Sequence, residues 1–208
     1  ATSLEVALDN VRQEDLIVLT CGLESSLCDL NPEQSSAKCY ACRGVTKVID
    51  RKILPNSLWL TLPQHELPLE YSLDFDYECL GVRLNEVVFG TLAVEYKTDD
   101  YLYAVQNHSF TLKALAKRCY NVLRWLQEIS TEYDIKDIVA FNGRLSYSRT
   151  AVLWAQKNSV DFILHERTSS KNRYVKRFNQ AVHSIEAGNN SIEEVWLNSD
   201  LALPEKEI

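Results

Sequence analysis

Apolar and polar residues follow two different rhythms along this chain. Four short runs are almost continuously apolar, as strands covered on both faces of a parallel sheet are; they are residues 15–20, 57–62, 137–141 and 160–164. Four other segments repeat their apolar residues every three or four positions, as helices do; they are residues 84–96, 109–133, 147–159 and 174–185. These rhythms predict an α/β protein with a Rossmann-like open, mostly parallel sheet flanked by helices.

The segment 137–164 has the order strand, helix, strand. A βαβ unit joins parallel strands by a right-handed crossover, so both strands end at the same edge of the sheet, where open α/β folds bind their ligands. A polar cluster follows each of these strands: Asn142, Gly143 and Arg144 after the first, and His165, Glu166 and Arg167 after the second. We therefore expect the two clusters to face one crevice.

The first polar cluster suits an anionic or polyhydroxylated ligand. Gly143 allows a sharp turn, and Arg144 offers a planar fork for a carboxylate, a phosphate or sugar hydroxyls. Asn142 both donates and accepts hydrogen bonds. Ser146 and Arg149 follow at the start of the next helix, whose N–H groups favour an anion. The structural alternative is a plain Asn-Gly turn, with Arg144 paired to a nearby acid.

In the second polar cluster, Glu166 stands where a general base is useful, directly after a buried strand and beside His165. Burial would raise the pKa of this carboxyl group, whereas Arg144 or Arg167 would lower it. The alternatives are a salt bridge from Glu166 to either arginine and a packed His165 without a role in the site.

Four of the six cysteines fall within 22 residues: Cys21, Cys28, Cys39 and Cys42. A CxxC pair supplies two thiolates to a tetrahedral metal, and two further thiolates complete a structural zinc site. The sequence therefore predicts a cysteine-rich, zinc-binding insertion at residues 21–42. Free thiols, a disulfide set, a redox CxxC and an iron–sulfur cluster are the alternatives.

Length and charge limit the classes of function. The 208 residues are enough for one domain with a full core, and the net charge of −7 argues against nucleic acid as a partner. The sequence has neither an apolar run of about 20 residues nor a secretion signal at its start. We expect a cytoplasmic protein without a transmembrane segment; peripheral association with the inner face of the membrane stays open.

Several short motifs, taken in order, resemble the amino-terminal region of bacterial capsule and surface-polysaccharide glycosyltransferases. These motifs are a first strand ending in Cys21, Cys28-x-x-Asn31, Cys39-x-x-Cys42, Phe141-Asn-Gly-Arg144 and His165-Glu-Arg167. The resemblance spans residues 15–185. It departs from the pattern at Thr168, where a glycine is expected.

The resemblance implies a GT-B architecture, in which the first domain binds the acceptor and a second domain binds the nucleotide-sugar donor. Residues 1–208 would then be a single acceptor-side domain, with the donor domain missing and the fragment inactive alone. The acceptor would be a carbohydrate or a lipid-linked sugar. Both polar clusters would face the cleft between the domains, and Glu166 would deprotonate the acceptor hydroxyl.

Two other classes of function compete with this one. A zinc-stabilised protein-interaction module without catalytic activity would leave an exposed apolar stripe on the helix at 109–133. A nucleotide-dependent α/β enzyme would use the same crevice, but the chain lacks both the GxGxxG and the GxxxxGK[ST] phosphate-binding sequences.

Overall fold

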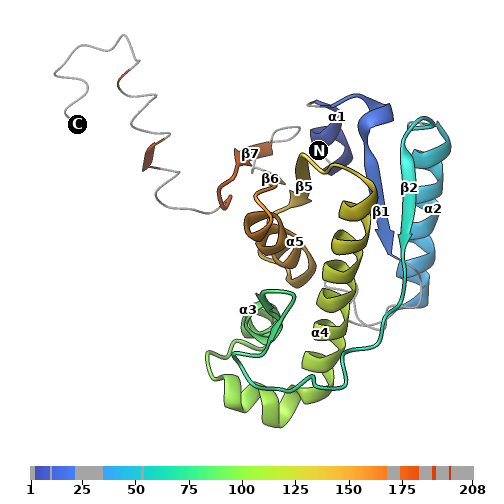
Figure 1. Ribbon diagram of the computed structural model, residues 1–208. Helices are drawn as coiled ribbons and strands as arrows, with labels where there is room; N and C mark the ends of the chain where they lie inside the picture. Colours follow the sequence, from blue (N-terminus) through green and yellow to red (C-terminus); the bar gives the residue numbers. More distant parts are fainter. Residues whose placement is uncertain are drawn as a thin grey trace.

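The computed structural model describes residues 3–9, 11–21, 35–52, 54–167, 174–182, 189–190 and 197 (Figure 1). Its helices are α1 (Ser3–Leu8), the short 3-10 helix η1 (Gln13–Asp15), α2 (Ser36–Lys52), α3 (Leu84–Tyr96), α4 (Tyr101–Glu132) and α5 (Ser146–Lys157). Its strands are β1 (Ile17–Cys21), β2 (Leu58–Leu62), β3 (Glu78–Cys79), β4 (Val82–Arg83), β5 (Asp137–Phe141), β6 (Asp161–Arg167) and β7 (Tyr174–Phe178).

The described strands form three small sheets rather than the one open sheet that the sequence predicts. β1 pairs with β2 in parallel, β3 and β4 form a short hairpin, and β5, β6 and β7 form a mixed sheet in that order. The α4 helix lies between the β1–β2 pair and the β5–β7 sheet (Figure 1). The mixed α/β class is confirmed, but β1 and β2 are not fully covered, because Leu19 is 39% and Leu58 38% exposed.

The predicted βαβ unit is present. β5 and β6 are parallel and in register from the pair Asp137 and Asp161 to the pair Phe141 and His165, and α5 connects them. The expected helix at 174–185 is wrong, because residues 174–178 form β7, antiparallel to β6. The sequence Tyr-Val-Lys-Arg-Phe has no clear period, so pairing with the neighbouring strand decides its conformation.

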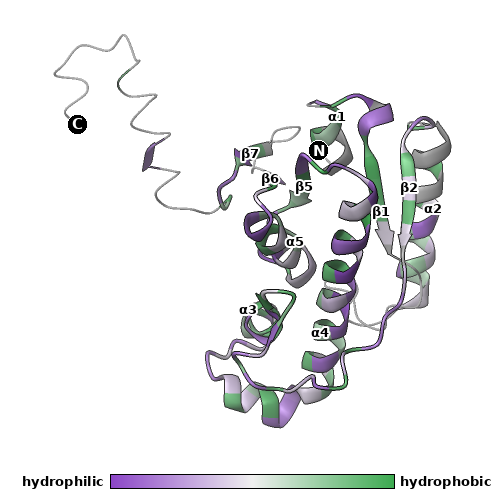
Figure 2. Ribbon diagram, in the orientation of Figure 1, coloured by the Kyte–Doolittle hydropathy of each residue, from purple (hydrophilic) through white to green (hydrophobic). Residues whose placement is uncertain are grey.

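The core centres on α4, whose apolar face is buried against α3 and α5. Figure 2 shows hydrophobic residues over most of α3, whereas α4 alternates between hydrophobic and hydrophilic turns. The buried apolar residues of α4 include Leu112, Leu115, Ala116, Cys119, Leu123, Trp125, Leu126 and Ile129. The exposed apolar stripe expected of an interaction module on this helix is therefore not found over the predicted range, although Phe110 at its start is exposed.

The start of α4 differs from the prediction at Ser109. The helix begins at Tyr101, where the Asp100 carboxylate caps it by accepting a hydrogen bond from the Tyr103 N–H at 3.1 Å. His108 then breaks the helical geometry with φ −131° and ψ 24°, and its ring stacks on Tyr96 at 3.8 Å between centroids. The predicted start at Ser109 thus directly follows a kink within α4 and is not an end of the helix.

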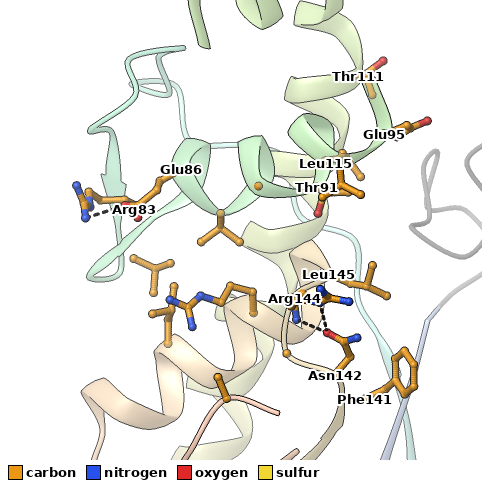
Figure 3. Close-up of a pocket in the computed structure, with 18 of the residues that line it drawn as sticks. Arg83, Glu86, Thr91, Glu95, Thr111, Leu115, Phe141, Asn142, Arg144 and Leu145 are labelled. Carbon is orange, nitrogen blue, oxygen red and sulfur yellow. Dashed lines mark hydrogen bonds and ion pairs between the residues drawn. The ribbon is translucent and has the colours of Figure 1, made fainter. Parts of the chain in front are cut away.

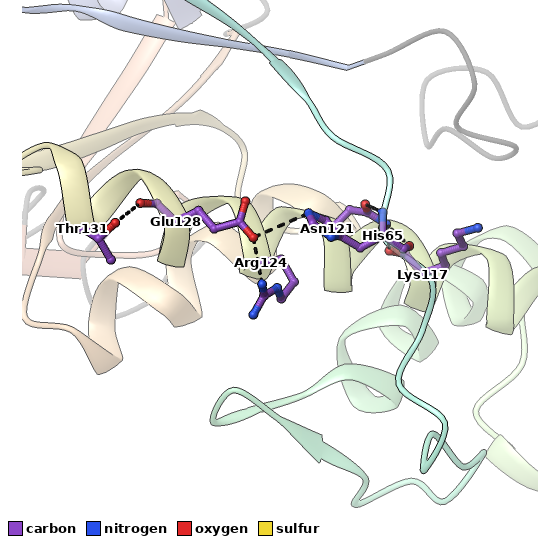
Figure 4. Close-up of polar contacts among 6 residues, drawn as sticks. All are labelled: His65, Lys117, Asn121, Arg124, Glu128 and Thr131. Atoms are coloured by element: carbon purple, nitrogen blue, oxygen red, sulfur yellow. Dashed lines mark hydrogen bonds and ion pairs between the residues drawn. The ribbon is translucent and has the colours of Figure 1, made fainter.

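The irregular segment 63–77 crosses α3 and α4 and is held by two buried asparagines. Asn121 bonds to the backbone of His65, as Figure 4 shows, and Asn85 donates to the carbonyls of Ser72 and Asp74. Both side chains are at most 7% exposed. A segment without regular structure has unpaired backbone groups, so these side chains satisfy part of that requirement.

The cysteine-rich region is helical where the structure describes it. Cys39 and Cys42 lie three residues apart on α2, whereas Cys28 and the side chain of Cys21 fall outside the described residues. Within the described ranges, no group of three or more His, Cys, Asp or Glu residues is arranged to hold a metal. The structure therefore gives no support to a zinc-binding insertion at 21–42.

None of the helices described is both long enough and apolar enough to cross a membrane.

Candidate functional site

A groove of about 1100 Å³ runs between α3 and α5 and reaches the carboxyl end of β5 (Figure 3). One wall comes from α3, and the other comes from residues 141–145 and the first turns of α5. Leu115 of α4 lines the groove between them, because α4 packs against both helices. Residues of the β3–β4 hairpin and residues 181–182 also belong to the lining. The volume is at the upper limit for small-molecule sites.

A tight turn carries the chain from β5 into the groove wall. Asn142 and Gly143 both have left-handed backbone angles, with φ 63° and 76°. The Asn142 N–H donates to the His165 carbonyl at 2.9 Å and so extends the β5–β6 pairing by one residue. A Cβ atom at Gly143 would lie 2.6 Å from Cδ1 of the buried Leu164. Glycine is therefore required here for both its backbone conformation and its lack of a side chain.

The side chain of Asn142 fixes the direction of Arg144. Its Oδ1 accepts from both the backbone N–H and the Nε of Arg144, each at 3.1 Å, as Figure 3 shows. Asn142 is only 7% exposed. Its Nδ2 has no hydrogen-bond partner within the part of the chain that the structure describes. Because both partners of Oδ1 are donors, the amide orientation is set, and Nδ2 remains as a donor at the groove.

The first turn of α5 follows directly. Its N-cap position holds Leu145, which supplies no side-chain hydrogen bond to the helix. Ser, Thr, Asn or Asp is preferred at this position because their side chains accept from the first N–H groups. Ser148 and Thr150 direct their hydroxyls back to the carbonyls of Leu145 and Ser146 instead. The amino end of α5 thus has no side-chain cap from its N-cap residue, and it borders the groove.

The α3 wall contributes polar groups that the sequence analysis missed. Thr91 lines the groove, and its buried Oγ1 points into the groove in Figure 3 and has no hydrogen-bond partner among the described residues. At the far end, Arg83 forms ion pairs with Glu86 at 2.7 Å and with Asp76 at 3.3 Å. No sequence motif marks these residues, because only the packing of α3 against α5 brings them opposite the strand end.

The second polar cluster lies at the same sheet edge, but its described side chains do not line the groove. His165 is 1% exposed and Glu166 is partly buried. Because side chains alternate along a strand, Glu166 lies on the same face of β6 as Leu164, which packs into the core with α5, and His165 lies on the other face. The side chain of Arg167 falls outside the described residues.

Burial determines the protonation of His165. Removal of the imidazole from water disfavours its charged form and lowers its pKa. Its ring contacts Phe141 edge to face, with centroids 5.6 Å apart. These features agree with the packed histidine considered above.

The aromatic side chains near the groove divide between the core and the groove lining. Tyr71, Tyr77 and Tyr101 pack among themselves and their neighbours in the core, and Tyr101 donates to the Leu73 carbonyl at 2.8 Å. The aromatic residues that line the groove are Tyr96, Phe110 and Phe141. Phe110 is 73% exposed, so its ring is accessible to a ligand at the rim.

Comparison with known proteins gives no match: no family model fits the chain, and no curated protein or solved structure is significantly similar to it.

Proposed function

We propose that this chain binds the saccharide acceptor of a sugar-transfer reaction, in the groove between α3 and α5. The observation that carries the proposal is the strand-end cluster in the groove wall: Asn142, Gly143 and Arg144 lie there together. Amide and guanidinium donors are the groups that recognise sugar hydroxyls and acidic substituents.

The shape and the lining of the groove support this proposal. The lining extends along α3 from Glu86 to Tyr96, which corresponds to a length of about 15 Å. An extended groove of this kind suits a chain of linked rings better than a single compact metabolite. Phe110 and Thr91 add an accessible aromatic face and a buried hydroxyl that lacks a partner.

The resemblance to capsule and surface-polysaccharide glycosyltransferases supplies the reaction. In this proposal a second, donor-binding domain holds the nucleotide sugar. Glu166 lies at the same sheet edge but outside the groove lining, so it would take the proton from an acceptor hydroxyl that extends beyond the groove. Glu166 comes directly after His165, which pairs with the end of β5 beside the Asn142 turn. Arg144 and Arg149 would orient the acceptor. The chain alone would bind the acceptor without transferring a sugar to it.

The proposal is tested by binding of oligosaccharides to the purified chain. A panel of tetrasaccharides from bacterial surface polysaccharides would be titrated into isotopically labelled protein, with amide shifts recorded by NMR. We expect saturable shifts at residues 91–96 and 141–149. Thr91→Val should weaken binding severalfold, whereas Thr131→Val, at an exposed position on α4, should not change it. A panel that produces no shifts in the groove would refute the proposal.

The role of Glu166 needs a separate measurement. In the longer enzyme that includes the donor domain, Glu166→Gln should lower kcat by a factor of about 100 or more with little change in KM, because it removes a base but keeps the shape. Activity close to that of the wild type would exclude Glu166 as the base.

A further inference from the structure

We infer that the end of the groove beside Asn142 and the first turn of α5 is an oxyanion subsite. The acceptor would then carry a carboxylate or phosphate group. This inference rests on the proposed function and specifies the class of saccharide. It depends on the charges at the two ends of the groove, which differ.

Within the described residues, no carboxylate pairs with the two arginines that line the groove at the start of α5. Arg144 and Arg149 both line the groove, and neither forms an ion pair with an acid within the described ranges. The contact found for the Arg144 side chain is a hydrogen bond to the neutral amide of Asn142. Glu95 also belongs to the lining, but its carboxylate points away from Arg144 in Figure 3. Both arginines therefore keep their full charge for a ligand.

The far end of the groove is different. Arg83 is paired there with both Glu86 and Asp76, so its charge is already balanced. Glu78 adds a further acid to the lining. Lys157 also reaches this end, where its Nζ lies beside Gly81, so this end carries charges of both signs. An anionic ligand group is thus favoured at the start of α5, which would give the bound saccharide a single direction.

Two neutral donors, Asn142 Nδ2 and Thr91 Oγ1, line the groove as well, and the start of α5 adds a helix dipole. The Nδ2 of Asn142 has no hydrogen-bond partner within the described chain, so it can donate to a ligand in the groove. The uncapped start of α5 adds the positive end of a 12-residue helix dipole at the same place. Thr91 Oγ1 lies across the groove on α3 and also lacks a partner. A bound oxyanion would satisfy the Asn142 donor and use the helix dipole.

The experiment compares saccharides that differ only in charge. Tetragalacturonate would be titrated against its fully methyl-esterified form, and maltotetraose 1-phosphate against maltotetraose. We expect one acidic member to bind at least tenfold more tightly than its neutral counterpart, and the pair that discriminates identifies the anion as carboxylate or phosphate. Equal binding within both pairs would overturn the inference while leaving saccharide binding established.

Variants distinguish the oxyanion subsite from a general effect of charge. Arg149→Gln and Arg144→Gln should each remove most of the preference for the acid, measured as the ratio of the acidic to the neutral affinity within the same variant. Arg43→Gln, at an exposed position on α2, is the matched control and should keep the preference. A preference that survives in both groove variants would overturn the inference.

Inorganic phosphate separates the two proposals. Phosphate should shift the amides of residues 142–149 in the wild type but not in Arg149→Gln, with circular dichroism used to confirm that the variant is folded. Such shifts without saccharide binding would refute the acceptor proposal and retain the oxyanion subsite. Saccharide binding without these shifts and without a preference for acid would refute the oxyanion subsite and retain the acceptor proposal.

Discussion

Asn121 pairs with the backbone of His65 through both ends of its amide. Its Oδ1 accepts from the His65 N–H at 2.6 Å, and its Nδ2 donates to the His65 carbonyl at 3.1 Å (Figure 4). This side chain thus provides the two bonds that a neighbouring strand would otherwise supply. A third bond, from Nδ2 to the Lys117 carbonyl at 2.7 Å, ties the pair to α4. The segment after β2 is therefore attached to the central helix at one defined residue.

Asn121→Ala should lower the free energy of unfolding by about 1–3 kcal/mol, because backbone groups of His65 lose their partners in a partly buried place. Asn107→Ala is the control on the same helix: Asn107 is exposed and bonds only within α4, to the Tyr103 carbonyl. Its effect should stay within about 0.5 kcal/mol. Urea denaturation measures both, and equal effects would contradict the role given to Asn121.

Gly143→Ala should destabilise the protein by about 1–3 kcal/mol, because the new methyl group meets Leu164 and the backbone must keep a positive φ. Gly90→Ala is the contrasting variant. Gly90 lies within α3, and a Cβ there meets no atom within 4 Å. Alanine should stabilise that helix by about 0.5–1 kcal/mol. Thermal melts that show the same sign for both variants would be inconsistent with this turn.

The burial of His165 predicts a dependence of stability on pH. Its pKa is lowered in the folded protein, so protonation favours the unfolded chain, whose histidine titrates near pH 6.5. The stability contributed by the neutral ring is present above this pH and is lost as the pH falls towards the folded pKa. The slope approaches about 1.4 kcal/mol per pH unit where the two states differ by one proton.

NMR titration of the His165 ring checks this prediction, together with denaturation of the wild type and of His165→Gln between pH 5 and pH 7.5. The variant should show a shallower loss of stability on acidification. An imidazole that titrates at or above pH 6.5 in the folded protein would contradict the assignment.

Asp137 and Asp161 are directly paired at the amino ends of β5 and β6. Burial, and secondarily the charge of Asp161, raises the pKa of Asp137. A raised acid pKa means that the folded state loses stability as the pH rises from about 3.9 through the folded pKa. Asp137→Asn should therefore increase the free energy of unfolding at pH 7 by about 0.5 kcal/mol and leave it unchanged near pH 3.

Asp134→Asn is the control for this variant. Asp134 is exposed and forms an ion pair with Lys136, so its replacement should give no gain in stability. A gain for Asp137→Asn that persists at pH 3 would show that it does not come from the carboxylate.

The sequence predicts the parts of this fold that depend on local pattern. The helix at 84–96 has the bounds of α3, and the parallel unit that leads into the Asn142 turn is present. The prediction of a helix at 174–185 was wrong, because the five residues of β7 carry too little periodicity to distinguish a strand from a helix. The prediction of a single open sheet was wrong, because local sequence patterns do not show that α4 separates two groups of strands.

The residues of the candidate site also divide into those that the sequence could predict and those that only the packing brings into the groove. Gly143 and Arg144 could be predicted because they directly follow a recognisable strand. Thr91 and Phe110 could not, because they belong to the groove only through the packing of α3 and α4 against α5. The two described members of the second cluster, His165 and Glu166, share the sheet edge but not the groove lining.

Leu115 influences the width of the groove, which the polar lining residues do not determine. It is 3% exposed and lies on α4, the helix that both walls pack against. The spacing of the walls therefore depends on side-chain volume in the core, whereas the charge preference depends on residues 142–149. Related chains could widen or narrow the groove by substitutions on α4 and keep the same chemistry at the strand end, so ligand size and ligand charge can evolve separately.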